Sequence, residues 1–266
     1  MDNLKQFPEA LTIAGNDSGG GAGMEADIKT MQACKTFSTN VLVGITAQNT
    51  LGVQDIYPLP EKIINQQFQS VFSDFEIKAA KTGALFDGEH VSIVVKNIMK
   101  YRIEKLVVDP VMIAKGGAHL LTDEAVATLK NELLPHAYLL TPNLPEAELL
   151  SGQEIKKNEE IVKVANSLQL MGAKNVIIKG GHAKGEKVFD FVKIANQDGY
   201  WLQSNRIRTS RTHGTGDTLS AAITAFLAQE KDLTTSIKLA HQYLHSIIEK
   251  PFIVGHGHGP LNHGGW

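Results

Sequence analysis

The chain has 266 residues, a formal net charge of −2 and a hydrophobic content of 42%. That length can bury a sizeable core, and the scattered Lys and Arg residues give no electrostatic footprint for nucleic acid or an anionic membrane. The amino-terminal segment lacks the basic-then-apolar layout of a signal peptide, and no apolar run approaches the roughly 18 residues of a membrane span. We therefore expect a cytoplasmic protein without nucleic-acid or membrane partners.

Short apolar segments alternate with amphipathic segments along most of the chain. The expected strands, in chain order, cover residues 9–15, 40–48, 77–83, 105–110, 137–143 and 175–181. The expected helices cover residues 24–35, 61–72, 90–100, 124–134, 145–150, 159–171, 215–229 and 234–249. This alternation predicts a parallel sheet that is covered by helices on both faces. Cys34, the single cysteine, has helical spacing with Met31 and is expected to be a buried core thiol.

The pattern changes after Gly181. Two segments of β-type residues, KVFDFVKIA and YWLQSNRI, flank the turn sequence QDG, and Gly199 can supply the positive φ that a hairpin turn needs. Neither a low-complexity linker nor an internal repeat interrupts the chain. We therefore expect one α/β domain over residues 1–266, with a small β excursion near residues 187–208.

Several of the predicted strands end in polar residues or glycine. These strand ends are Gly15, Gln48, Lys81, Asp109, Asn143 and Lys179. Ligands of open α/β sheets bind beyond the carboxyl ends of the strands. Gly and Asn are also ordinary turn residues, so it is the set rather than any single member that indicates a binding site.

The first glycine-rich turn, AGNDSGGGAGMEAD, lies between a predicted strand and a predicted helix and holds five glycines within residues 15–23. Its GAGMEA segment formally matches the dinucleotide fingerprint G-x-G-x-x-G/A. However, residues 16–20 separate that match from the strand, and no acidic residue follows at the required spacing. No Gly-Lys-Ser/Thr follows either, which excludes a P-loop. The turn is expected to approach another ligand, and Asp27 either points into that pocket or compensates the helix dipole.

A second glycine turn, HGTGD at residues 213–217, leads directly into an Ala-rich predicted helix. Two glycines allow consecutive amides to form an anion-binding nest, to which the helix dipole adds positive potential. Such a site suits the charge that develops on a transferring phosphoryl group. Asp217 would repel phosphate unless it orients a substrate hydroxyl and accepts its proton. The alternative is that Asp217 only caps the helix.

The GTGD signature before a late helix resembles that of the ribokinase superfamily. Within it, the chain resembles the hydroxymethylpyrimidine/phosphomethylpyrimidine kinases of thiamine biosynthesis, and related pyridoxal kinases share part of the pattern. The matching segments, spread in order over almost the whole chain, are ALTIAGNDSGGGAGMEADIKT, ITAQNTLGVQ, KTG, VVDPVMIAKGG, LLTPNLPEAELLSG, VIIKGGH, THGTGDTLSAA and GHGPLNH. The resemblance implies a ribokinase-like three-layer αβα sandwich, ATP as phosphoryl donor, Mg²⁺ as cofactor, a small pyrimidine or pyridine alcohol as substrate, and a homodimer.

The resemblance also assigns roles to individual residues. Substrate contacts are implied for Gly15, Ala22, Asp27, Gln48 and Val111. Nucleotide contacts are implied for Lys179, Asn143 and His213, and hydrated Mg²⁺ for Asn143 and Glu146. The catalytic turn is implied to consist of Gly214, Thr215, Gly216 and Asp217.

Two positions depart from the family pattern. Members of this family usually have Cys at the position of Asp217, and a Met often follows KTG where this chain has Ala84. Both departures point toward pyridoxine or pyridoxal phosphorylation as the alternative activity, and a catalytically silent ligand-binding relative is a further alternative. The tail histidines His256, His258 and His263 are expected to have a structural or rim role, because the glycines between them make a poor metal-ligand set.

Overall fold

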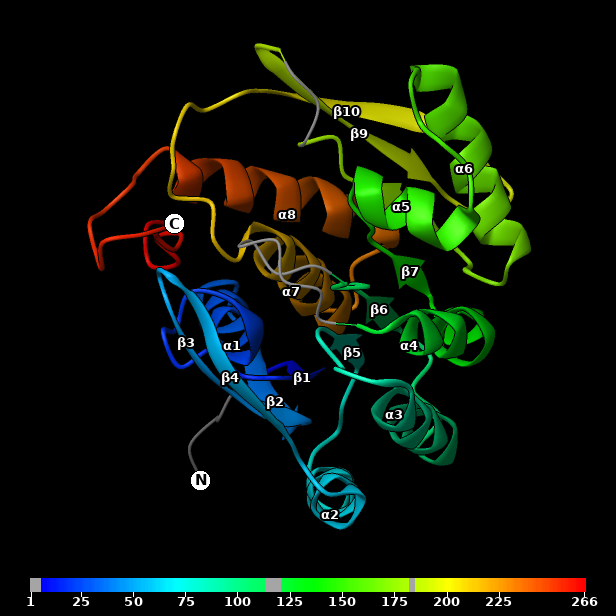
Figure 1. Ribbon diagram of the computed structural model, residues 1–266, viewed down its shortest axis with the longest axis vertical. Coiled ribbons are helices and arrows are strands. Elements are labelled where there is room, and N and C mark those ends of the chain that lie inside the picture. Colours follow the sequence, from blue (N-terminus) through cyan, green and yellow to red (C-terminus); the bar gives the residue numbers. More distant parts are fainter. Residues whose placement is uncertain (1–5, 113–120, 182–184) are drawn as a thin grey trace.

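The computed structural model describes residues 6–112, 121–181 and 185–266, and its centre is an eight-stranded sheet (Figure 1). The strands are β1 (Glu9–Ala14), β2 (Phe37–Leu42), β5 (Ala79–Thr82), β6 (Leu106–Val108), β7 (Leu139–Leu140), β8 (Val176–Ile178), β9 (Lys187–Lys193) and β10 (Tyr200–Asn205). Their order is β10-β9-β8-β7-β6-β5-β1-β2. All neighbouring pairs from β2 to β8 are parallel, whereas β8, β9 and β10 pair antiparallel. The predicted, mainly parallel sheet is therefore confirmed.

Helices cover both faces of this sheet. They are α1 (Gly23–Ala33), α2 (Glu61–Phe72), α3 (Gly88–Lys100), α4 (Asp123–Thr128), α5 (Leu144–Ser151), α6 (Asn158–Leu170), α7 (Thr215–Ala228) and α8 (Leu233–Ile248). Figure 1 shows α1, α7 and α8 on one side of the row of strands and the remaining helices on the other. The helix expected to end before Pro135 continues from α4 as a π-helical turn (Leu129–Leu133) and a short 3-10 turn.

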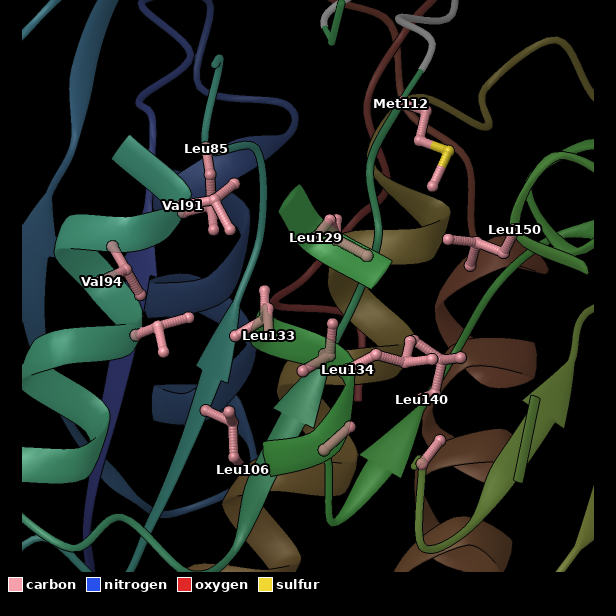
Figure 2. Close-up of a cluster of buried hydrophobic side chains, with 14 of the residues drawn as sticks. Leu85, Val91, Val94, Leu106, Met112, Leu129, Leu133, Leu134, Leu140 and Leu150 are labelled. Carbon is pink, nitrogen blue, oxygen red and sulfur yellow. The ribbon is translucent and has the colours of Figure 1, made fainter. Parts of the chain in front are cut away.

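The core is divided by the sheet into two apolar layers. Along β1, Leu11 and Ile13 face the layer of α2 to α6, whereas Ala10 faces the layer of α1, α7 and α8. Figure 2 shows part of the first layer, in which Leu133 and Leu134 lie between α3 and the strand β7. Both faces of the central strands are thus buried, which explains their nearly continuous apolar sequences.

The prediction of a single strand over residues 40–48 is wrong, because two separate strands, β2 and β3 (Gly44–Asn49), cover this segment. The chain leaves the main sheet at Val43, whose N–H donates to Ala14 and whose carbonyl accepts from Leu59. Beyond it, β3 pairs antiparallel with β4 (Gly52–Pro58) in a separate two-stranded sheet. Gly44 leaves room for Phe86, because a Cβ there would lie 2.4 Å from the ring of Phe86. The strand β4 was not predicted, because its alternation of apolar and polar residues is weak.

The expected β excursion near residues 187–208 is confirmed as an antiparallel pair, β9 and β10, but it extends the main sheet rather than standing apart from it. Cys34 is buried, as expected of a core thiol, and its burial raises the pKa of the thiol to about 12. No helix in the described part of the chain is long and apolar enough to cross a bilayer.

Candidate active site

The first glycine turn is organised by Asp17, which is almost fully buried. Its carboxylate accepts hydrogen bonds from the N–H groups of Gly19 (2.8 Å), Gly21 (3.0 Å) and Ala22 (2.9 Å). His213 Nε2 lies 2.9 Å from Asp17 Oδ2. Burial alone would raise the pKa of Asp17, but the contacts with His213 and the turn amides outweigh it and lower that pKa. The first turn is therefore built around a carboxylate that reaches the second turn.

The second glycine turn packs directly on the first. Gly214 has φ of +80°, and a Cβ at this position would lie 2.0 Å from the carbonyl oxygen of Gly21. A glycine is therefore required both by the left-handed backbone and by the close approach. Gly214 is the N-cap of α7, so the N–H groups of the first helical turn lie at the positive end of the helix dipole. This arrangement suits an anion, as the sequence predicted.

Asp217 lies in the first turn of α7, with a side chain that is 14% exposed. Its Oδ1 is 3.7 Å from Nζ of Lys81, which is completely buried at the end of β5. Lys81 Nζ in turn lies 2.6 Å from Oδ1 of Asp27. Thr12 donates its hydroxyl to the other oxygen of Asp27 at 2.5 Å. The buried carboxylate of Asp27, the buried Lys81 and the carboxylate of Asp217 thus lie in one continuous row.

Asp27 was predicted to contact the substrate, but its carboxylate already has partners within the protein. Both carboxylate oxygens have partners within the protein, and the side chain is fully buried. Burial raises the pKa of Asp27 to about 7, although the charge of Lys81 opposes that change. A direct contact between Asp27 and the substrate stays a prediction; what the structure places at Asp27 is the ion pair with Lys81.

A second lysine lies beside the anion-binding turn. Lys179 Nζ is 3.0 Å from Oδ1 of Asp109, and Ser220 donates its hydroxyl to the other oxygen of Asp109. A Cβ on Gly216 would lie 3.1 Å from Lys179 Nζ, so the turn passes directly over this ammonium. Burial lowers the pKa of Lys179, but the carboxylates of Asp109 and Glu146 raise it more. The turn therefore meets a permanent positive charge.

The proposed metal ligands form the amino-terminal cap of α5. Asn143 Oδ1 accepts from the N–H of Glu146, and Glu146 Oε2 accepts from the N–H of Asn143, so the two residues make a capping box. Asn143 also bridges to Lys179 across the end of the sheet. Burial raises the pKa of Glu146 to about 7, against the attraction of Lys179.

One buried carboxylate near the anion-binding turn fits a particular kind of Mg²⁺ site. Mg²⁺ commonly keeps several waters and binds through one or two carboxylates together with substrate phosphates. The described ranges contain no group of three His, Cys, Asp or Glu side chains that could hold a metal ion. The oxygen atoms of Asn143 and Glu146 are of the donor type that Mg²⁺ prefers, so Mg²⁺ binding by this pair stays a prediction.

Of the remaining predicted substrate residues, Gly15, Ala22 and Gln48 lie at or beside the two turns, and Val111 follows a neighbouring strand. Gly15 follows β1, and a Cβ there would lie 2.3 Å from the ring of Phe86. Ala22 is the N-cap of α1, and Gln48 Nε2 lies 3.2 Å from His213 Nε2. Val111, half-buried, follows the end of β6. The rest of that motif, residues 113–117, and position 182 of the VIIKGGH segment fall outside the described residues.

Three residues of the site had no individual role in the prediction: Lys81 and Asp109 were named only among the polar strand ends, and Asp17 was not singled out. Asp17 had a usable signal, because an aspartate within a glycine-rich turn often accepts hydrogen bonds from the amides that follow it. Lys81 had another, because a lysine in an apolar strand is buried only with a partner. The partners themselves come from distant segments, which sequence periodicity cannot place.

The tail histidines occupy different settings. His263 is buried, and its Nε2 lies 3.0 Å from Oγ1 of Thr218 on α7, whereas His256 and His258 are exposed. Burial, together with the charge of Lys29, lowers the pKa of His263 to about 4. The tail thus packs on α7, the helix that begins at the second glycine turn.

A mainly parallel αβα sandwich with a glycine turn at the start of α7 places the chain among the ribokinase-like proteins. The profile of the family "Phosphomethylpyrimidine kinase" matches residues 17–262. The chain therefore belongs to the phosphomethylpyrimidine kinase family.

Individual relatives agree with this assignment. A hydroxymethylpyrimidine/phosphomethylpyrimidine kinase of Haemophilus influenzae is 47% identical over 99% of this chain and 98% of its own. The crystal structure of phosphomethylpyrimidine kinase from Clostridium difficile has a TM-score of 0.80 at 39% identity, covering 89% of this chain and 97% of that one. The ADP complex of Bacillus subtilis pyridoxal kinase has a TM-score of 0.90 at 34% identity, covering 98% of each chain.

Proposed function

We propose that the protein transfers the γ-phosphoryl group of ATP to the hydroxymethyl group of 4-amino-5-hydroxymethyl-2-methylpyrimidine, and then a second phosphoryl group to the resulting monophosphate, in thiamine biosynthesis. In each step the acceptor oxygen forms a bond to the γ-phosphorus, and the bond between that phosphorus and ADP breaks. The observation that carries the proposal is the placement of the Asp217 carboxylate and the amides of Gly214–Asp217 on one turn at the positive end of α7. The relatives named above support the pyrimidine substrate.

In this proposal, the second glycine turn and the polar residues beside it have distinct roles in phosphoryl transfer. Asp217 accepts the proton of the attacking hydroxyl, as a carboxylate base does in phosphoryl transfer. The amides of the turn and Lys179 stabilise the charge on the equatorial phosphoryl oxygens. Asn143 and Glu146 would hold a hydrated Mg²⁺, which neutralises phosphate charge when bound. In this proposal, catalysis rests on positioning and electrostatics.

On the acceptor side, we assign the substrate to the region where the two glycine turns meet. Gln48 would hydrogen-bond the edge of the ring, and Val111 would pack on its face. The backbone near Gly15 and Ala22 would enclose the acceptor or its phosphate. The half-exposed amide of Gln48, already in contact with His213, supports this assignment.

The proposal is tested by measuring kcat/KM with ATP for the pyrimidine alcohol, its monophosphate and pyridoxal side by side. We expect both pyrimidines to exceed pyridoxal by roughly tenfold or more. The identity to the pyrimidine kinase of H. influenzae, 47%, is higher than that to the B. subtilis pyridoxal kinase, 34%. Faster turnover of pyridoxal would overturn the substrate assignment. Nucleotide binding without turnover of any alcohol would indicate a ligand-binding relative instead.

The catalytic role is tested with Asp217→Asn, which keeps the shape of the side chain and removes its basicity. We expect kcat to fall by about 10²–10⁴. An unchanged kcat with every alcohol would contradict the mechanism.

A further inference from the structure

Lys81 is a fully buried cation beneath the catalytic turn. It extends from the end of β5, between α1 and α7, and its side chain has no solvent exposure. Burying an ammonium is costly unless carboxylates or other acceptors surround it. Here Asp27 is in direct contact at 2.6 Å, and Asp217 lies on the other side at 3.7 Å.

The two contacts of Lys81 differ in kind. The contact with Asp27 is a hydrogen-bonded ion pair, and Thr12 occupies the other oxygen of the same carboxylate. The separation of 3.7 Å from Asp217 is too long for a hydrogen bond but short enough for strong charge attraction. Asp217 can therefore be held as an anion while its lone pairs stay available to an incoming hydroxyl.

The other charges that face Asp217 come from neighbouring strand ends. Lys179 also attracts it, but that ammonium is hydrogen-bonded to Asp109. Among the described side chains, Lys81 is the cation whose Nζ lies within 4 Å of the Asp217 carboxylate. Asp27 and Asp109 also bring negative charge to this end of the sheet, and Lys81 attracts all three carboxylates, those of Asp27, Asp217 and Asp109.

We propose that Lys81 is a positioning residue for phosphoryl transfer, which keeps Asp217 ionised and holds its carboxylate beneath the acceptor hydroxyl, while Asp27 anchors the lysine. The inference rests on the proposed role of Asp217 as the base. Lys81 itself touches neither substrate nor nucleotide in this scheme. Burial lowers the pKa of Lys81, but the surrounding carboxylates raise it more, so the lysine stays charged over the working pH range.

The pH dependence of kcat tests this role. In Lys81→Met the loss of the cation raises the pKa of Asp217, so the acid limb of the kcat profile moves to higher pH by about one unit or more. We expect kcat of Lys81→Met to fall on the acid side of the profile and to recover toward high pH, while KM for ATP changes less than about twofold. Thr12→Val is the matched control, because it damages the same buried cluster without removing a charge.

The outcomes separate the proposal from a purely structural role. An acid limb of Lys81→Met that coincides with that of Thr12→Val would overturn the proposal, whatever the absolute rates. Where Lys81→Met does not fold, the double variant Asp27→Asn/Lys81→Met leaves no unpaired buried charge. Its acid limb is expected to move in the same direction by a smaller amount, and an unmoved limb would again overturn the proposal.

A second measurement does not depend on turnover. In Asp217→Cys the new thiol occupies the position next to Lys81, and the pH dependence of its alkylation by iodoacetamide reports its pKa. We expect a pKa about one unit below the usual value of about 8.5, and an increase when Lys81→Met is added. Buried Cys34 supplies the unreactive background. Equal thiol pKa values in the two variants would refute the role of Lys81, even if the kinase assignment holds. If the wild-type enzyme is inactive but the thiol pKa shifts as expected, only the kinase assignment is refuted.

Discussion

His213 Nε2 lies 2.9 Å from Oδ2 of Asp17, a contact between residues 196 positions apart in the sequence. Asp17 also accepts hydrogen bonds from the amides of Gly21 and Ala22. One carboxylate therefore shapes the first glycine turn and fixes His213, the first residue of the second turn. The geometry of both glycine turns thus depends on the same buried group.

Asp17→Asn is expected to loosen both turns, because a neutral amide is a weaker acceptor and brings N–H donors toward the backbone N–H groups. We expect a loss of about 2 kcal/mol in the free energy of unfolding and a several-fold increase in KM for the alcohol. Urea unfolding and steady-state kinetics measure the two effects. The exposed residue Asp74 gives the control variant Asp74→Asn, and equal behaviour of the two variants would contradict this role.

Gly214→Ala places a methyl group where the carbonyl of Gly21 lies, and also imposes an unfavourable left-handed backbone. We expect at least about 2 kcal/mol of destabilisation and a loss of most of the kcat. Gly264→Ala is a suitable control, since a Cβ there meets nothing within 4 Å. Thermal unfolding and turnover of both variants provide the comparison, and a Gly214→Ala enzyme with wild-type kcat would be inconsistent with the described packing.

Glu146→Gln is expected to weaken the use of Mg²⁺, because it removes the charge of the buried carboxylate next to Asn143 and leaves the capping geometry similar. The Mg²⁺ concentration that gives half-maximal activity should increase by roughly tenfold or more. Addition of EDTA should abolish turnover of the wild-type enzyme. Exposed Glu154→Gln serves as the reference. An unchanged Mg²⁺ dependence in Glu146→Gln would remove Glu146 from the metal site.

The buried His263 makes stability depend on pH. The imidazole is held neutral in the folded protein, with its pKa lowered from 6.5 to about 4. The unfolded chain therefore binds the extra proton first, and the stability that the neutral ring contributes is complete above about pH 6.5 and lost as the pH falls toward 4. At pH 5 the loss amounts to about 2 kcal/mol.

Urea unfolding at pH 7 and pH 5 measures this contribution. We expect His263→Gln to lower the free energy of unfolding at pH 7. The difference between the free energies of unfolding at pH 7 and pH 5 should become smaller by about 2 kcal/mol. Exposed His256→Gln should leave that difference as in the wild type. A His263→Gln protein with the wild-type pH dependence would rule out His263 as the responsible group.

The strength of the local sequence signals decided what could be predicted. The buried strands and their helices were predictable because apolar runs and helical periodicity are strong local patterns. The break at Val43 was not predictable, because the residues on both sides are equally β-type and the pairing of β3 with β4 has no distinct local signal. In the site, the anion-binding turn followed from glycine spacing. The partners of Lys81 did not, because Asp27 and Asp217 come from opposite ends of the chain.

The close contact between Gly214 and Gly21 has a consequence for protein engineering. The two glycine turns are in direct contact, since a Cβ on Gly214 would lie 2.0 Å from the carbonyl oxygen of Gly21. In a library that varies only one turn, most new side chains at the contact will clash with the backbone of the other turn. Changes of substrate range at this site are therefore best sought by diversifying residues 15–23 and 211–216 together.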